Sequence, residues 1–126
     1  MTSFLENDVE LNKVLTGKVI ASASSSLTFF AVKFADGSGV LLESVGTPES
    51  LTVKHTVMPA DELPQIDEAV CKVDWGWIAE SKIKSVRTTI GSFKFMLEPA
   101  EDLLVTAMIW DQKPFLGFKP YQASSK

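Results

Sequence analysis

Apolar and polar residues alternate in short segments along most of the chain from Gly17 onward. Successive side chains of a β-strand point to opposite faces of a sheet, and β-branched and aromatic residues favour that conformation. In the first half of the chain the pattern predicts four strands, at residues 17–24, 27–34, 39–45 and 51–58. The sequence Asp36-Gly37-Ser38-Gly39 predicts a hairpin turn between the second and third strands, because glycine readily adopts positive φ.

The last third of the chain shows the same alternation of apolar and polar residues. Phe93, Phe95 and Leu97 alternate with Lys94 and Glu98, as in an antiparallel strand with one face on the core and one in solvent. We therefore expect the three apolar side chains to be buried. The pattern predicts four strands here, at residues 83–91, 92–99, 103–111 and 114–121.

The segment between the two groups of strands admits two interpretations. Prolines around an acidic cluster interrupt the strand pattern at residues 59–70, which favours a helix that begins near Asp61 or Pro64. Apolar residues then recur at helical spacing, so this helix would continue to about residue 80. Alternation over residues 70–77 instead predicts a strand. The pattern slightly favours the helix.

These elements predict an α+β fold of antiparallel sheets, with about four strands, a helix and about four more strands. Residues 4–15 precede them as either a short helix or an irregular arm. The 126 residues are expected to form a single domain, residues 1–126. The mean hydropathy of +0.13 is high for a small protein, so we expect a homo-oligomer that hides apolar surface. Trp75 and Trp77 are the candidate interface residues.

The N-terminal sequence and the single cysteine favour a cytoplasmic protein. The first ten residues carry three acids, no base and no sustained apolar run, unlike a secretory signal. The longest dense apolar stretch, residues 103–110, is far shorter than the roughly 20 residues that cross a bilayer, so no membrane association is expected. One cysteine excludes an internal disulfide and fits a reducing compartment.

Catalytic and metal-binding patterns are weak in this sequence. His55 is the only histidine, and its place in an alternating strand favours a hydrogen-bonded, half-buried role over that of a general base. Nothing near Cys71 in the sequence would activate its thiol, and one residue of each kind is too few for a zinc site. The paired acids at 61–62, 67–68 and 101–102 suit solvation and capping. We expect a protein that is not an enzyme and has no cofactor or metal.

Charge is distributed unevenly along the chain, whose net charge is −4. Residues 82–97 contain four cations and no acid, with phenylalanines and hydroxyls between them. Cations beside aromatic rings suit single-stranded nucleic acid, since phosphates bind the cations and bases stack on the rings. The competing interpretation is a solvated hairpin whose lysines prevent edge pairing and whose phenylalanines face the core. The candidate nucleic-acid-binding residues are Lys82, Lys84, Arg87, Phe93 and Lys94.

The order of elements resembles a known fold. Four strands, a helix around "DELPQIDEAV" and four strands ending at "FLGFKPY" resemble the positive-cofactor and Whirly type of single-stranded-DNA-binding transcription regulators. The chain also looks similar to small cyanobacterial proteins with that fold. The resemblance implies dimers or higher oligomers whose curved sheets present the four cations to a strand of nucleic acid. The chain departs from that family in its acidic net charge and in lacking a C-terminal helix pattern.

The leading hypothesis is therefore a non-enzymatic protein that binds single-stranded DNA or RNA through a basic and aromatic hairpin. One alternative is a homo-oligomeric protein-interaction or assembly module whose tryptophans meet a partner chain. Another is a carrier of a small apolar ligand, which would require the strands to enclose a cavity.

Overall fold

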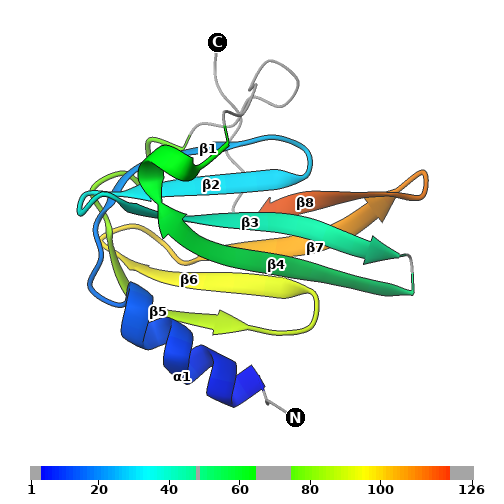
Figure 1. The fold of residues 1–126 in the computed structure, drawn as a ribbon, viewed down its shortest axis with the longest axis horizontal. Helices are drawn as coiled ribbons and strands as arrows, with labels where there is room; N and C mark the ends of the chain where they lie inside the picture. Colours follow the sequence, from blue (N-terminus) through cyan, green and yellow to red (C-terminus); the bar gives the residue numbers. More distant parts are fainter. Residues whose placement is uncertain (1–3, 48, 65–74, 120–126) are drawn as a thin grey trace.

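The computed structural model describes residues 4–47, 49–64 and 75–119 and shows a mostly β protein with antiparallel sheets (Figure 1). One helix precedes two groups of four strands, and a short 3-10 helix, η1 (Ala60–Glu62), lies between the groups. The expected order of strands, a helical element and strands is thus confirmed. The remaining elements are α1 (Phe4–Leu15), β1 (Ile20–Ser25), β2 (Phe29–Phe34), β3 (Ser38–Thr47), β4 (Ser50–Pro59), β5 (Lys82–Thr88), β6 (Ser92–Glu98), β7 (Leu103–Trp110) and β8 (Lys113–Lys119).

Each group of strands forms an antiparallel meander in which neighbours in sequence are neighbours in space. The first sheet has the order β1-β2-β3-β4 and the second β5-β6-β7-β8. The longest pairing joins β3 and β4 over ten residue pairs, from Ser38 opposite Pro59 to Thr47 opposite Ser50. Residues of β3 and β4 lie close to β7 and β8, so the two sheets pack face to face (Figure 1).

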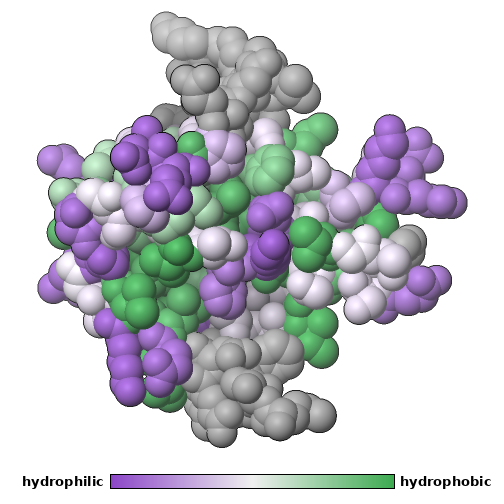
Figure 2. Space-filling model, viewed as in Figure 1, coloured by the Kyte–Doolittle hydropathy of each residue, from purple (hydrophilic) through white to green (hydrophobic). Residues whose placement is uncertain are grey.

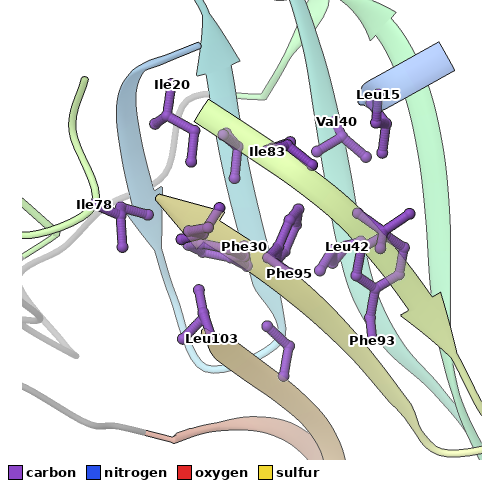
Figure 3. Packing of buried hydrophobic residues seen from close by; sticks show 14 of the residues in the cluster. Leu15, Ile20, Phe30, Val40, Leu42, Ile78, Ile83, Phe93, Phe95 and Leu103 are labelled. Carbon is purple, nitrogen blue, oxygen red and sulfur yellow. The ribbon is translucent and has the colours of Figure 1, made fainter. Parts of the chain in front are cut away.

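A continuous apolar core fills the space between the sheets (Figure 3). Phe30 of the first sheet meets Phe95 of the second with ring centroids 6.2 Å apart, and Phe95 lies 4.8 Å from Phe93. All three rings are 1% exposed or less. Burying a side chain of this size stabilises the fold by about 1.5–3 kcal/mol. The expected burial of Phe93, Phe95 and Leu97 is confirmed.

Helix α1 covers the open edge of the second sheet. Leu11 and Leu15, one helical turn apart, are buried in the common core. The side-chain amide of Asn12 bonds to the backbone of Val86 as a neighbouring strand would. Nδ2 donates to the Val86 carbonyl at 2.9 Å, and the Val86 N–H donates to Oδ1 at 2.8 Å. Both backbone groups of Val86 at the edge strand β5 are thereby satisfied. Of the two predictions for residues 4–15, the helix is confirmed.

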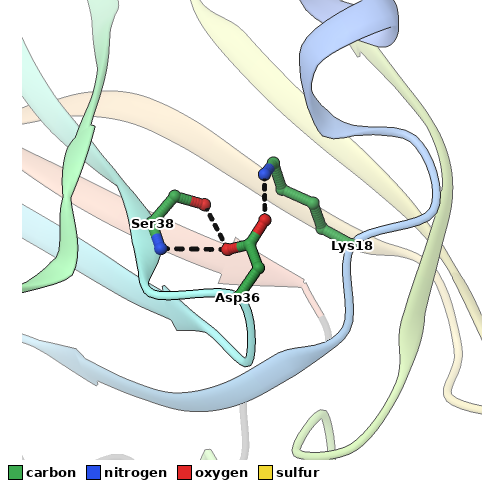
Figure 4. A network of polar contacts seen from close by, with 3 residues as sticks. All are labelled: Lys18, Asp36 and Ser38. Carbon is green, nitrogen blue, oxygen red and sulfur yellow. Dashed lines mark hydrogen bonds and ion pairs between the residues drawn. The ribbon is translucent and has the colours of Figure 1, made fainter.

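A polar network fixes the turn between β2 and β3 (Figure 4). Asp36 accepts hydrogen bonds from the Ser38 N–H at 2.9 Å and the Ser38 hydroxyl at 2.6 Å, and it forms an ion pair with Lys18. Gly37 has φ +91°, so the predicted need for glycine in this hairpin is confirmed. Because Lys18 precedes β1, the pair also joins the start of the first sheet to this turn.

The predicted helix to residue 80 is wrong over residues 75–80, where the structure has consecutive turns. Ile78 N–H donates to the Trp75 carbonyl and Ala79 N–H to that of Gly76, both at 3.2 Å. Glu80 then adopts φ 68°, and its N–H donates to the Ile20 carbonyl at 2.7 Å. This bond to the first residue of β1 ends the turns just before β5 begins. The earlier part of the segment, residues 65–74, lies outside the described residues.

Trp75 belongs to the core rather than to a subunit interface. Its ring is 5% exposed and lies 4.6 Å from that of Phe30 and 4.8 Å from that of Phe118. Its indole N–H donates to the Ser25 hydroxyl at 2.9 Å, and Ser25 is itself fully buried. The structure therefore corrects the assignment of Trp75 to an interface. Trp77 is half-buried against the same core.

Candidate nucleic-acid interface

The face of the second sheet that points away from the core carries the predicted cations. In β6 the buried residues are Phe93, Phe95 and Leu97, so Lys94 and Met96 point outward. The same alternation in the neighbouring strands places one set of side chains on this outer face. That set includes Arg87, Ser92, Lys94, Leu104, Thr106, Met108, Trp110, Lys113, Phe115, Gly117 and Lys119.

Strand register brings three cations into one line across the outer face. Arg87 lies opposite Lys94, Lys94 opposite Leu104, and Leu104 opposite Lys119. We call Arg87, Lys94 and Lys119 the cationic row, and all three side chains are exposed. Strands are about 4.8 Å apart, so Lys94 lies about 5 Å from Arg87 and about 10 Å from Lys119 at the backbone. The sequence did not indicate Lys119, because only the register of β6, β7 and β8 places it in line with Lys94.

The other two predicted cations lie outside this row. Lys82 pairs with Glu98 across the strands, with Nζ and Oε2 3.4 Å apart, so its charge is locally balanced. Lys84 is exposed at a bulge in β5, where the register shifts between Ile83 and Ser85. Of the four predicted cations, the structure therefore brings Arg87 and Lys94 together.

Phe93 does not contribute to the outer face. Its ring is fully buried and packs on Phe95 inside the sandwich. A base stacks on a ring only where one face of that ring is accessible, so the structure corrects the assignment of Phe93 as a stacking residue. The competing interpretation, in which the phenylalanines of this segment face the core, holds for both Phe93 and Phe95.

The aromatic residues of the outer face lie at its other end, on the β7–β8 hairpin. Trp110 is 77% exposed and stands opposite Lys113 across the hairpin turn. Phe115 is half-buried on the same face, opposite Met108. The tip of this hairpin lies at the same end of the molecule as the tip of the β3–β4 hairpin (Figure 1) and carries hydrophilic side chains (Figure 2). Trp110 was missed from sequence because it closes an apolar run, residues 103–110, that is typical of a core strand.

A hollow of about 420 Å³ lies between this hairpin and the β1–β2 turn. Leu27, Trp110 and Phe115 supply apolar walls, and Asp111 and Lys113 lie at the same site. We call it the Trp110 pocket. The backbone N–H of Leu116 in β8 donates to the Leu27 carbonyl at 2.7 Å, which fixes the two walls relative to each other.

A second hollow of about 550 Å³ lies at the opposite edge of the outer face, between α1 and β5. Its lining includes Asn12, Lys13, Ser85 and Arg87. Arg87 therefore lies between this hollow and Lys94. Lys13, at the far side of the hollow, pairs with Glu10, with Nζ and Oε1 3.6 Å apart, so its charge is locally balanced.

The remaining polar candidates do not form a catalytic constellation among the described residues. The His55 ring lies edge-on to Phe93 with centroids 5.6 Å apart and is half-buried, as its alternation predicts. Asp102 accepts a hydrogen bond from the Leu97 N–H at 3.3 Å, so one predicted acidic pair has a structural role. Within residues 4–47, 49–64 and 75–119, no three His, Cys, Asp or Glu side chains lie close enough to share a metal ion. Cys71 lies outside the described residues.

None of the helices within the described part of the chain is long and apolar enough to cross a membrane. Comparison of the chain with models of protein families, with curated proteins and with solved structures gave no match. The resemblance to the positive-cofactor and Whirly type therefore rests on the order of elements alone and stays a prediction.

Proposed function

We propose that this protein binds single-stranded DNA or RNA, without catalysis, on the outer face of its second sheet. The observation that carries the proposal is the cationic row, in which three strands each contribute an exposed cation to one line. Phosphates of an extended strand are attracted to such a line, while side chains between the cations contact sugars and bases. Homo-oligomerisation and a cytoplasmic location remain predictions from the sequence.

The cationic row lowers the stability of the fold, and this supports a binding role. Like charges directly opposite on neighbouring strands destabilise a sheet, and Arg87 and Lys94 are such a pair. An opposite-charge pair at these positions would contribute roughly 0.2–1 kcal/mol to folding. The fold thus gives up stability at this point, and a polyanion that binds both side chains would recover it.

Hydroxyl groups form the next line on the same face. Ser92 lies opposite Thr106, and Ser92 precedes Lys94 by two positions on the outer side of β6. The hydroxyls of Thr89 and Ser92 are 2.6 Å apart and share a hydrogen bond. Such groups can donate to phosphate oxygens and accept from sugar hydroxyls. They extend the polar part of the outer face beside the cationic row.

The alternative function, a protein-interaction module anchored on the tryptophan pair, loses its principal residue. Trp75 lies in the core, so its ring offers no surface to a partner chain. Substituting it would damage the fold before it tested an interaction. Nucleic-acid binding is thus the function that the outer face supports best.

The test is a fluorescence-polarisation titration of a labelled oligo(dT) or oligo(U) of about ten nucleotides at about 50 and 200 mM salt. Lys94→Glu is the key variant, because a glutamate at this position would pair with Arg87 and raise the free energy of unfolding by roughly 0.5 kcal/mol. We expect it to weaken oligonucleotide binding nonetheless. The slope of log affinity against log salt should become shallower by about 0.7 for each phosphate that the variant no longer binds.

Lys33→Glu is the matched control. Lys33 is exposed on the first sheet, opposite Ser22 and Gly39, so this variant makes the same change in net charge away from the outer face. We expect it to retain the affinity and the salt slope of the original chain. If the two variants weaken binding equally, or if no oligonucleotide binds at the lower salt concentration, the proposed function is wrong.

A further inference from the structure

Trp110 is unusually exposed, because tryptophan has the largest side chain of the twenty amino acids and is seldom left in solvent. It is 77% exposed, whereas Trp75 is 5% exposed and Trp77 is half-buried. Leu27 across the pocket is 52% exposed and Met108 beside it 45% exposed. Contiguous exposed apolar surfaces often mark binding sites, whereas single exposed apolar side chains are common on any protein surface.

The pocket is held open by backbone geometry rather than by a flexible arm. Asp111 and Gln112 form a two-residue turn with φ 51° and 61°, the left-handed geometry that matches the twist of a tight hairpin. This turn places Trp110 opposite Lys113. The hydrogen bond between the Leu116 N–H and the Leu27 carbonyl fixes the other wall. The walls are therefore organised before any ligand arrives.

The chemistry of the pocket favours a flat, uncharged group. Its walls are mainly apolar, and the charges of Lys113 and Asp111 beside them are opposite. A phosphate would be attracted by Lys113 and repelled by Asp111, so the net electrostatic attraction of the pocket for a phosphate is small. An aromatic base would gain stacking on Trp110 or Phe115 while its own phosphate remains outside the pocket in solvent.

We propose that the Trp110 pocket takes one nucleobase of the strand whose phosphates lie along the cationic row. This inference rests on the proposed function and adds the location of a base. Lys119 of the row and Lys113 at the pocket lie on the same face of β8, six residues apart, which corresponds to about 20 Å. A strand that reaches both therefore needs roughly four or more nucleotides. The pocket and the row lie on one continuous surface, so one ligand can occupy both.

The experiment separates base contacts from phosphate contacts. Trp110→Ala should weaken binding of oligo(dT) about 5- to 100-fold, since stacking is lost, and should leave the salt slope unchanged. An oligonucleotide with the same phosphates but abasic sugars should bind the original chain and Trp110→Ala equally. Trp110→Phe should retain most of the affinity. Val14→Ala, an exposed apolar position on α1, is the control and should bind as the original chain does.

A direct readout comes from tryptophan fluorescence. Because Trp75 and Trp77 lie in or against the core, a change of emission on adding oligo(dT) is expected from Trp110 and should be absent in Trp110→Phe. If Trp110→Ala binds oligo(dT) as the original chain does, the inference fails and the proposed function stands. If no oligonucleotide binds at all, both fail. If Trp110→Ala instead separates a sedimenting dimer into monomers with unchanged oligonucleotide binding, the pocket is a subunit contact and the inference is overturned.

Discussion

Asp36 shows how one charged residue connects separate parts of this chain. The hydrogen bonds from the side chains of Lys18 and Ser38 and from the Ser38 N–H hold the pKa of Asp36 well below its usual value. The carboxylate orders the β2–β3 turn, and Lys18 at the same time covers the Phe34 ring with Nζ 5.8 Å from the ring centroid. The ionised form of Asp36 is therefore the one that the fold stabilises.

This lowered pKa predicts a pH dependence of stability. A carboxyl whose pKa is lower in the folded chain stabilises the fold fully above its unfolded pKa of about 3.9, and this contribution is lost as pH falls toward the folded pKa. We expect Asp36→Asn to lower the melting temperature at pH 7 and to differ less from the original chain near pH 3. Thermal unfolding followed by circular dichroism at several pH values would measure this. Asp61→Asn, at an exposed carboxylate of η1, is the control, and an equal pH dependence in both variants would contradict the assignment.

Among the elements, the edge strand β5 is bonded to residues 17–20 at its start and is covered by a helix further along. An open strand edge presents unpaired N–H and carbonyl groups that recruit further strands. In this chain α1 lies along β5, and Asn12 occupies both backbone groups of Val86. The helix therefore occupies part of this edge and also contributes Leu11 and Leu15 to the core.

Asn12→Leu tests the edge protection, because leucine is similar in size and favours helix formation but cannot bond to Val86. We expect the free energy of unfolding to fall by about 1–3 kcal/mol, since two backbone groups lose their partner. We also expect concentration-dependent association, visible in sedimentation velocity, because the edge is open to a second chain. Lys13→Ala, at the next and exposed position of α1, should change neither quantity appreciably. Equal behaviour of the two variants would show that Asn12 has no protective role.

The strands were predictable from sequence because their signals are local. Alternation within each strand and the Asp36-Gly37 turn depend on residues that are neighbours in the chain, and the structure contains all eight strands near their predicted positions. The turns at residues 75–80 were not predictable in this way. Their end is determined by the bond between Glu80 and Ile20, which are distant in sequence.

The candidate site shows the same division between local and non-local information. Arg87 and Lys94 were predicted because they lie in one basic segment, whereas Lys119 joins them only through strand register. The burial of Phe93 followed from the alternation that also buries Phe95, so the sequence already contained the argument against its stacking role. The exposure of Trp110 depends on which face of the second sheet the register of β7 and β8 gives it, and the apolar run itself does not report this.

At the scale of the whole molecule, the two meanders share one core and are linked at a corner. The Ile20 N–H donates to the Ser81 carbonyl and the Ile83 N–H to the Lys18 carbonyl, both at 2.9 Å, so the start of β1 lies antiparallel beside the start of β5, with a bridge between Val19 and Lys82. Trp75 adds a side-chain link, because it bonds to Ser25 and packs on Phe30 of the first sheet and on Phe118 of the second.

We therefore expect the chain to unfold as one cooperative unit. Neither sheet retains a complete apolar face without the other, so circular dichroism and tryptophan fluorescence should report a single coincident denaturant transition.

Trp75→Ala should lower the free energy of unfolding by about 3–5 kcal/mol, because it leaves a cavity between the sheets and removes the partner of the buried Ser25 hydroxyl. Its transition should stay single and move to lower denaturant, since the loss is shared by both sheets. Trp110→Ala is the matched tryptophan control and should leave the midpoint nearly unchanged, because its ring is mostly exposed. Two separated transitions in the original chain, or a Trp75→Ala variant in which one sheet melts alone, would show that the meanders are independent units.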